Sequence, residues 1–246
     1  MKNRLDRPLA SAGRRLVDRS PSALMGLYRL RYRNSSFHRR ILGPSTAILI
    51  EGFPRSGNSF ANRAFQHANP ELADRIATHV HLSAHVIEAA RLKVPSIVPF
   101  RDPSACIPSL YALRRSVDAG AKDPTNLDTW LRDYIAFAER VHDVADDVVL
   151  APFEKLTSDY GEVIDVVNQK YGTGFVRFNH DERSVEDVFA SSGSHLSPSK
   201  TRQSDKDRGD MLYAASSPQL RGRADRSYRA LLRIVPTQLG DTHVTG

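Results

Sequence analysis

Short apolar runs alternate along the chain with longer stretches in which apolar residues recur at helical spacing. Buried strands are predicted from four of these runs, at residues 47–50, 76–82, 97–100 and 148–153. Helices are predicted from the amphipathic stretches near residues 58–69, 125–145, 158–171 and 218–234. Strands that alternate with helices form parallel sheets covered by helices. The pattern therefore predicts an α/β fold, a three-layer α/β/α sandwich with a central parallel sheet in a single domain.

The turn between the first predicted strand and the first predicted helix has the composition of an anion-binding loop. Backbone N–H groups in this position lie at a helix N-terminus, where the helix dipole favours a negative charge. The spacing of Gly52, Gly57 and Ser59 fits the phosphate loop of nucleotide-binding proteins, but Asn58 stands where that loop has lysine. A cation is present instead at Arg55. We therefore expect a P-loop-NTPase-like fold whose loop binds one phosphate-like centre rather than a triphosphate.

A second polar turn follows the third predicted strand. Arg101 stands at the carboxyl end of that strand, and Asp102 with Pro103 predicts the start of a helix. Ser109 lies two turns into this helix. Pro99 within the strand predicts an edge strand or a strand end, because proline cannot donate to a sheet.

The two turns together resemble the sulfotransferases that use 3′-phosphoadenosine 5′-phosphosulfate (PAPS). The 5′-phosphosulfate loop of that family reads Pro, Lys or Arg, Ser, Gly, Thr or Asn, Ser or Thr, and then an aromatic or apolar residue. Residues 54–60 match this order, and Arg101 and Ser109 have the separation of the family's 3′-phosphate ligands. The resemblance covers roughly residues 46–205. It implies transfer of a sulfuryl group from PAPS to a hydroxyl, with release of the desulfated nucleotide, PAP.

The resemblance also implies which residues bind the co-substrate. They are Arg55, Ser56, Gly57, Asn58, Ser59, Phe60, Arg101, Ser109, Phe153 and Arg202. By resemblance, Phe60 and Phe153 contact adenine, and Arg55 also acts in catalysis by neutralising charge on the bridging oxygen. Arg202 belongs to residues 191–210, which we expect to form a mobile loop over the nucleotide; a solvated loop without that role is the alternative. No metal site is expected, because one cysteine and scattered histidines give no metal-binding pattern.

Two histidines follow the second predicted strand. Strand alternation would place His79 and His81 on one face. In the family, a histidine after the second strand is the general base, within a Lys-Thr-His-Leu-like segment. Aligned on His-Leu, His81 takes that position and His79 takes the position of the lysine. Both are catalytic candidates, and a hydrogen-bonded, partly buried ring without a catalytic role is the alternative.

Positive charge is concentrated at the N-terminus. Residues 1–43 hold eleven Lys or Arg and two Asp, whereas the rest of the chain holds 24 basic and 26 acidic residues. We therefore expect a basic, partly helical arm over residues 1–44, a sulfotransferase domain over 45–235 and a flexible tail over 236–246. The arm would pack on the body or on a second copy in a homodimer, with peripheral contact to an anionic membrane as the alternative. No motif for nucleic-acid binding is present.

The remaining features of the sequence bear on the cellular location of the protein and on alternative functions. The single Cys106 excludes an intramolecular disulfide, no apolar run of about 18 residues is present, and residues 1–23 lack a signal-peptide core. We expect a cytoplasmic enzyme, peripheral at the membrane if the arm binds there, acting on a glycan, lipid or small-molecule acceptor. The alternatives are a P-loop-type nucleotide or small-molecule kinase, and a non-catalytic PAP- or anion-binding module.

Overall fold

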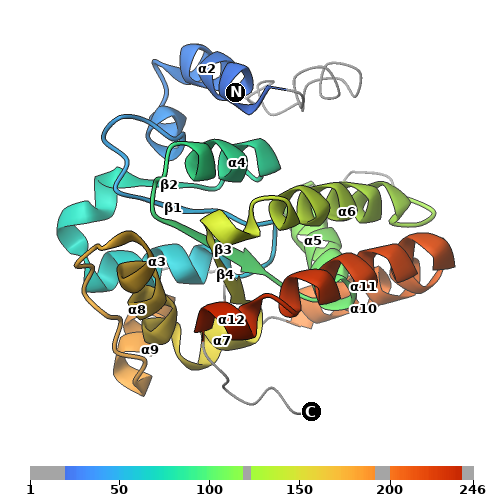
Figure 1. Ribbon diagram of the computed structural model, residues 1–246. Coiled ribbons are helices and arrows are strands. Elements are labelled where there is room, and N and C mark those ends of the chain that lie inside the picture. The colour runs from blue at the N-terminus through green and yellow to red at the C-terminus, as the bar shows by residue number, and fades with distance from the viewer. Residues whose placement is uncertain (1–19, 119–122, 192–199, 240–246) are drawn as a thin grey trace.

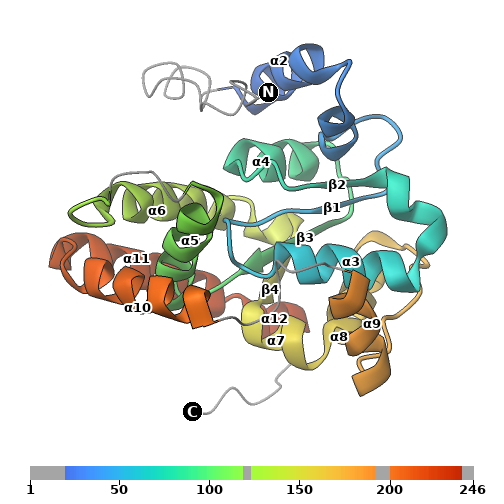
Figure 2. The same ribbon diagram turned by 180° about the vertical axis from the view of Figure 1, so that it is seen from behind.

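The computed structural model describes residues 20–118, 123–191 and 200–239. Within these residues the protein is a mixed α/β structure in which helices surround a small parallel sheet (Figures 1 and 2). The prediction of an α/β fold with a parallel sheet is confirmed.

Four strands form the sheet, in the order β2-β1-β3-β4. They are β1 (Ile48–Ile50), β2 (Ile76–Thr78), β3 (Ser96–Phe100) and β4 (Val149–Pro152). The register sets Leu49 opposite Ala77 and Ser96, and it sets Val98 opposite Leu150. Every strand residue is buried. Burial of both faces explains why the strands read as nearly continuous apolar runs in the sequence.

Helices lie on both sides of the sheet. The helices between and directly after the strands are α3 (Asn58–Ala68), α4 (Ser83–Arg91), α5 (Pro103–Val117), α6 (Asp128–His142), α7 (Phe153–Ser158) and α8 (Tyr160–Tyr171). The C-terminal part contains α9 (Glu182–Ser191), α10 (Lys200–Ala214), α11 (Pro218–Leu232) and α12 (Val235–Leu239). Short 3₁₀ helices occupy Ser36–Arg40 (η2), Pro70–Arg75 (η3) and Ala145–Asp147 (η4). In Figure 1, α4 lies above the strands, whereas α8 lies below them.

The strand order brings the two polar turns of the sequence together. From β1 the chain passes to β2 on one side and then returns to β3 on the other side of β1. In open parallel sheets, ligands bind at such a switch point, beyond the carboxyl ends of the strands. The loop over residues 52–57 follows β1 and Arg101 follows β3, so both turns lie at this switch point.

Gly52 and Pro99 allow the two turns to approach closely. A Cβ atom on Gly52 would collide with the Pro99 carbonyl oxygen, so a side chain at this position does not fit. The ladder between β1 and β3 ends at Ile97, so Pro99 faces the loop on its β1 side, while on its other side it pairs with Ala151 of β4. Of the two alternatives predicted from Pro99, the strand end holds: the proline lies near the end of β3, which is an inner strand.

Two other sequence predictions are corrected in the C-terminal half. The helix predicted over residues 125–145 runs from Asp128 to His142, and the Asp128 carboxylate accepts a hydrogen bond from the backbone N–H of Ser217 at 2.9 Å. Residues 200–210 belong to α10 and not to a mobile loop; residues 192–199 lie outside the described part of the chain. Gly209 makes this packing possible, since a Cβ there would lie 2.9 Å from the carbonyl oxygen of Pro108 in α5.

Residues 20–44 of the basic arm fold against the body of the protein. Helix α2 (Pro21–Tyr32) packs on α4 (Figure 1), through a small buried cluster of Leu24, Met25, Ile41 and Ala84. The opposite side of α2 leaves Leu27 and Leu30 exposed. Residues 1–19 lie outside the described part. Among the described helices, none is long and apolar enough to cross a membrane.

Replacing Gly52 tests the close approach of the two turns. We expect Gly52→Ala to lower the free energy of unfolding by ~3 kcal/mol or more, because the new methyl group meets a backbone oxygen that cannot move aside. Chemical denaturation measures the change. Gly174→Ala is the matched control, since a Cβ at Gly174 meets no atom within 4 Å. Equal stability of the two variants would contradict the expectation.

Candidate functional site

Buried side chains hold the loop between β1 and α3 in place by hydrogen bonds to its carbonyl oxygens. Asn58 is 3% exposed, and its Nδ2 donates to the carbonyl oxygens of Gly52 at 3.2 Å and Phe53 at 2.9 Å. Cys106 of α5 donates from Sγ to the Pro54 carbonyl oxygen at 3.0 Å. Burial raises the pKa of the Cys106 thiol to about 12, so it remains a neutral donor. The backbone of the loop is thus held in place without a ligand.

The open side of the loop presents a helix N-terminus. Helix α3 begins after Gly57, which has a left-handed φ of 98° and provides no side-chain cap for the first N–H groups. Uncapped N–H groups at a helix start attract anions. Arg55 also has a left-handed φ, 71°, a conformation that is uncommon for a residue with a side chain. Strained backbone of this kind is often found in loops that bind ligands.

Arg101, Ser109 and Phe153 converge on Arg55 of this loop from three different segments. Arg55 Nε donates to Ser109 Oγ of α5 at 2.9 Å. The guanidinium carbon of Arg101 lies 3.9 Å from the centroid of the Phe153 ring, and Arg101 Nη1 lies 3.5 Å from the Arg55 carbonyl oxygen. A Cβ on Gly57 would lie 3.2 Å from the Phe153 ring, so the ring borders the loop itself. Two cations, a hydroxyl and an aromatic face are therefore gathered at the switch point.

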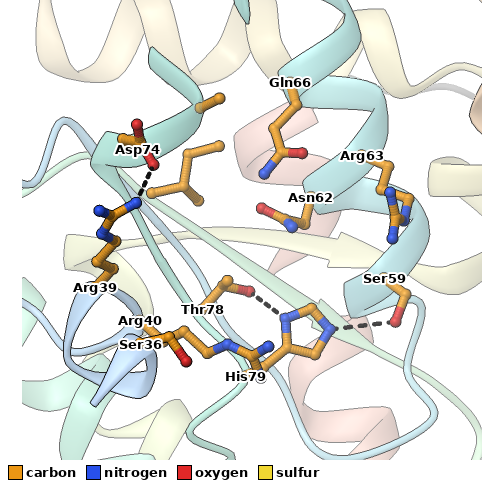
Figure 3. Close-up of a pocket in the computed structure, with 12 residues that line it drawn as sticks. Ser36, Arg39, Arg40, Ser59, Asn62, Arg63, Gln66, Asp74, Thr78 and His79 are labelled. Carbon is orange, nitrogen blue, oxygen red and sulfur yellow. Dashed lines mark hydrogen bonds and ion pairs between the residues drawn. The ribbon is translucent and has the colours of Figure 1, made fainter. Parts of the chain in front are cut away.

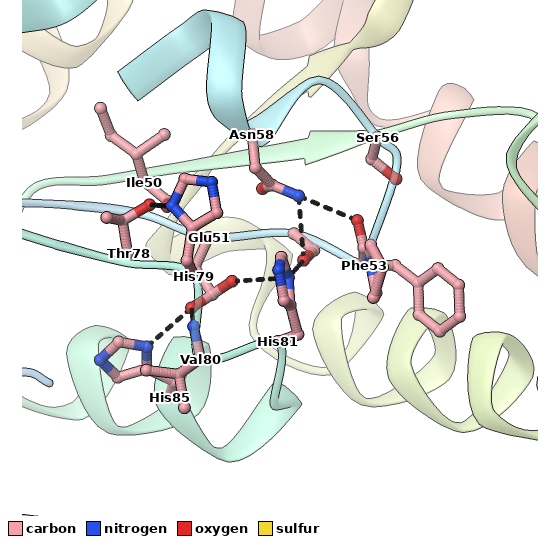
Figure 4. A network of polar contacts seen from close by, with 12 residues as sticks. Ile50, Glu51, Phe53, Ser56, Asn58, Thr78, His79, Val80, His81 and His85 are labelled. Carbon is pink, nitrogen blue, oxygen red and sulfur yellow. Dashed lines mark hydrogen bonds and ion pairs between the residues drawn. The ribbon is translucent and has the colours of Figure 1, made fainter. Parts of the chain in front are cut away.

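A buried carboxylate lies next to the loop, directly after β1. Glu51 is fully buried at the end of β1 (Figure 4). Its Oε2 accepts from Val80 N at 2.7 Å and from His85 Nδ1 at 3.0 Å, and its Oε1 lies 3.4 Å from His81 Nδ1. Burial alone would raise the pKa of Glu51, but hydrogen bonds from His81 and His85 outweigh it. The pKa is held well below its usual range, and the carboxylate is ionised.

His85 links Glu51 to the N-terminal arm through hydrogen bonds at both of its ring nitrogens. Its Nε2 accepts from the backbone N–H of Leu42 at 3.0 Å, which leaves the proton on Nδ1 for Glu51. The ring is fully buried and both nitrogens are engaged.

His81 is oriented by Glu51 and by the loop backbone. Its Nδ1 donates to the Gly52 carbonyl oxygen at 2.9 Å, so Nε2 is the nitrogen available for proton transfer. The side chain is 31% exposed. Burial lowers the pKa of His81, but the hydrogen bond and the charge of Glu51 more than offset this effect, and the pKa lies above the ordinary value.

His79 lies in a different electrostatic setting. Thr78 Oγ1 donates to the Ile50 carbonyl oxygen at 2.7 Å, so it accepts from His79 Nδ1 at 2.9 Å. His79 Nε2 then accepts from Ser59 Oγ at 3.2 Å. Burial, followed by the positive charge of His81, lowers the pKa of His79 to about 4. His79 is therefore neutral near pH 7, and both of its nitrogens are occupied.

The structure places three of the candidate binding side chains away from the open side of the loop. Ser56 is fully buried, with Oγ 3.9 Å from Cys106 Sγ, and Asn58 turns back to the loop carbonyls. Phe60 is 6% exposed because it packs against the rings of Tyr160, Phe178, His180 and Phe189. Contact of Phe60 with adenine is therefore replaced by a core role. Arg202 lies in the first turn of α10, and its side chain lies outside the described part.

Sequence reasoning missed Glu51, the buried carboxylate next to the loop. The available signal was a charged residue directly after a buried strand and before a phosphate loop, since a carboxylate at such a position must be paired. Across the described residues, no group of three or more His, Cys, Asp or Glu side chains is arranged to hold a metal ion.

Comparison of the chain with protein-family models and with curated proteins gives no match.

The two candidate histidines should be distinguishable by titration. In NMR titrations of the imidazole resonances, we expect His81 to titrate above about 6.5 and His79 near 4. Glu51→Gln removes the charge that stabilises protonated His81, so its pKa should fall by ~1 unit or more. Glu186→Gln, on exposed α9, should leave both values unchanged. A His81 that titrates below the ordinary value in the unaltered protein would contradict this assignment.

Proposed function

We propose that this protein is a PAPS-dependent sulfotransferase with a three-layer, P-loop-NTPase-like architecture. The observation that carries the proposal is the convergence of Arg55, Arg101, Ser109 and Phe153 on an uncapped helix N-terminus at the switch point of the sheet. The helices on both sides of the parallel sheet support the architecture. The resemblance of residues 54–60 to the 5′-phosphosulfate loop supports the choice of donor.

The donor would be held at both of its phosphates. The N–H groups at the start of α3 and the Arg55 guanidinium would bind the 5′-phosphosulfate. Arg101 and Ser109 would bind the 3′-phosphate, which ATP lacks. In the structure Ser109 Oγ accepts a hydrogen bond from Arg55 Nε. A proposed ligand of the 3′-phosphate is therefore in contact with a proposed ligand of the 5′-phosphosulfate. Phe153 offers the adenine a stacking surface beside Arg101.

Transfer requires a base for the acceptor and a cation for the leaving group. His81 Nε2 would take the acceptor's hydroxyl proton while the acceptor oxygen bonds to sulfur. The bond between sulfur and the bridging oxygen breaks, and the electron pair leaves with PAP. Arg55 and the loop N–H groups would stabilise the charge on that oxygen. Glu51 would stabilise the imidazolium that forms, as it lies 3.4 Å from His81 Nδ1.

A kinase acting on a nucleotide or small molecule is the alternative from the same fold. Such enzymes use the P-loop lysine to reach the β- and γ-phosphates. Asn58 occupies that position, and its buried amide binds loop carbonyls, which favours a donor without a triphosphate. A non-catalytic PAP- or anion-binding module is the second alternative. The pairing of His81 with buried Glu51 favours an enzyme, because perturbed pKa values cluster at catalytic sites.

Nucleotide titration tests the donor. By calorimetry, we expect PAP to bind without magnesium and more tightly than ATP. Arg101→Ala should weaken PAP binding about 10- to 100-fold, the range for loss of a hydrogen bond to a charged group. Arg226→Ala, an exposed arginine on α11, is the control and should not change the affinity. Preference for magnesium-bound ATP would support a kinase instead.

Turnover of labelled PAPS with a library of hydroxyl acceptors tests the base. His81→Ala should lower kcat by about 100-fold or more, because it removes the proton acceptor. His142→Ala, which alters an exposed histidine, should not. Since the base must be neutral, turnover should fall as pH is lowered through the raised pKa of His81. If His79→Ala stops turnover while His81→Ala does not, the base has been assigned to the wrong histidine.

A further inference from the structure

A polar cavity of about 310 Å³ lies next to the loop, between α3, η2 and η3 and beside β2 (Figure 3). Ser59 and His79 line one end of it, and their hydrogen bond is drawn in Figure 3. Ser59 stands in the first turn of α3, so the cavity begins where the phosphate loop ends. Its volume is near the lower end of the ~300–1,000 Å³ typical of small-molecule sites.

The charge of the cavity is positive. Three arginines and one carboxylate line it, and Arg39 pairs with the carboxylate of Asp74 at 3.1 Å. Arg40 comes from η2 and Arg63 from α3, and within the described part of the chain neither forms a salt bridge with a carboxylate. Burial is the largest cause of the lowered pKa of His79, and the positive charges of Arg40 and Arg63 add to it. Both cations are therefore close enough to act on a ligand beside His79.

Uncharged polar side chains also line the cavity. Asn62 and Gln66 stand on the same face of α3 as Arg63, and their side chains point into the cavity in Figure 3. The Oδ1 atom of Asn62 is buried and has no hydrogen-bond partner among the described residues. A buried carbonyl oxygen without a partner costs about 1–3 kcal/mol, so a ligand hydroxyl that donates to it would be favoured.

We propose that this cavity binds the acceptor, and that the acceptor is a sugar-sized polyol carrying a carboxylate, phosphate or sulfate group. The inference rests on the proposed sulfotransferase function. The anionic group would pair with Arg40 and Arg63, and the other hydroxyls would bind Asn62 and Gln66. The reacting hydroxyl would then lie at the end of the cavity formed by Ser59 and His79. The ring centroid of His81 lies 5.6 Å from that of His79, so the base is adjacent to this end.

The proposal predicts a preference for charged over neutral acceptors of the same shape. The full chain would be assayed with labelled PAPS against two matched pairs: methyl glucuronide with methyl glucoside, and glucose 6-phosphate with glucose. We expect kcat/KM to be about tenfold or more higher for the anionic member of at least one pair. The carboxylate and phosphate pairs distinguish which anion the cavity takes.

Variants connect this preference to the cavity. Arg63→Gln and Arg40→Gln should each reduce the preference about tenfold by raising KM, whereas Arg63→Lys should restore part of it. Arg226→Gln, on exposed α11, is the matched control and should leave the preference unchanged. Thermal unfolding of each variant establishes that the fold is retained.

A separate binding measurement distinguishes failure of this inference from failure of the proposed function. With PAP bound, glucose 6-phosphate or methyl glucuronide should shift the NMR resonances of the Asn62 and Gln66 side-chain amides. If PAP binds and neither compound shifts them, or if neutral sugars react equally well, the acceptor class is wrong and the donor assignment stands. If PAP itself does not bind, the sulfotransferase proposal fails and the acceptor proposal fails with it.

Discussion

The rest of the site depends on the hydrogen bonds and ion pairs that the buried carboxylate of Glu51 makes. Removing a carboxylate from water costs several kcal/mol unless its oxygens are paired. Here one oxygen is satisfied by Val80 N and His85 Nδ1, and the other faces His81. All three partners come from the segment between β2 and the first turns of α4. The charge therefore holds this segment against the end of β1, next to the loop over residues 52–57.

The contacts of Glu51 explain two unusual backbone conformations and the placement of the N-terminal arm. His79 and His81 both have a left-handed φ of 58°, which costs about 1–3 kcal/mol each and persists only where surrounding contacts fix it. Glu51 supplies such contacts by binding His81 and the residue between the two histidines. His85 extends the same chain of hydrogen bonds to Leu42, where the arm joins the body. The position of η2, which brings Arg40 to the polar cavity, is thus linked to the carboxylate at the centre.

The α/β class, the parallel sheet and the convergence of the two turns could be predicted from the sequence, whereas several side-chain directions could not. Buried parallel strands leave a strong apolar signal, and the carboxyl ends of neighbouring parallel strands must meet, which places Arg101 beside the loop. The directions of Ser56 and Asn58 depend on Cys106 and on loop carbonyls, partners that local sequence spacing does not reveal. Both histidines follow the end of β2 and have a left-handed φ, so the strand alternation predicted for them does not apply, although their ring centroids lie 5.6 Å apart.

Helix α10 shows why a polar stretch can be misread as a loop. Residues 200–210 contain few apolar side chains, so periodicity gives no helical signal there. The helix is stabilised by tertiary contact instead: Gly209 lets its backbone pack on Pro108 of α5, and Leu212 is buried one turn later. Propensity and pattern are weak guides where packing decides the structure.

The position of positive charge distinguishes this loop from one that binds a triphosphate. A P-loop lysine delivers its charge from the first turn of the helix, whereas here that turn contributes Asn58, whose amide only braces the loop. The cations come from the loop itself, at Arg55, and from the next strand, at Arg101. Two charges supplied by two strands can bind two separate anionic groups, but only if the strands lie close together. The contact between Gly52 and Pro99 sets that separation, so the selectivity proposed for the site would depend on a glycine that carries no charge.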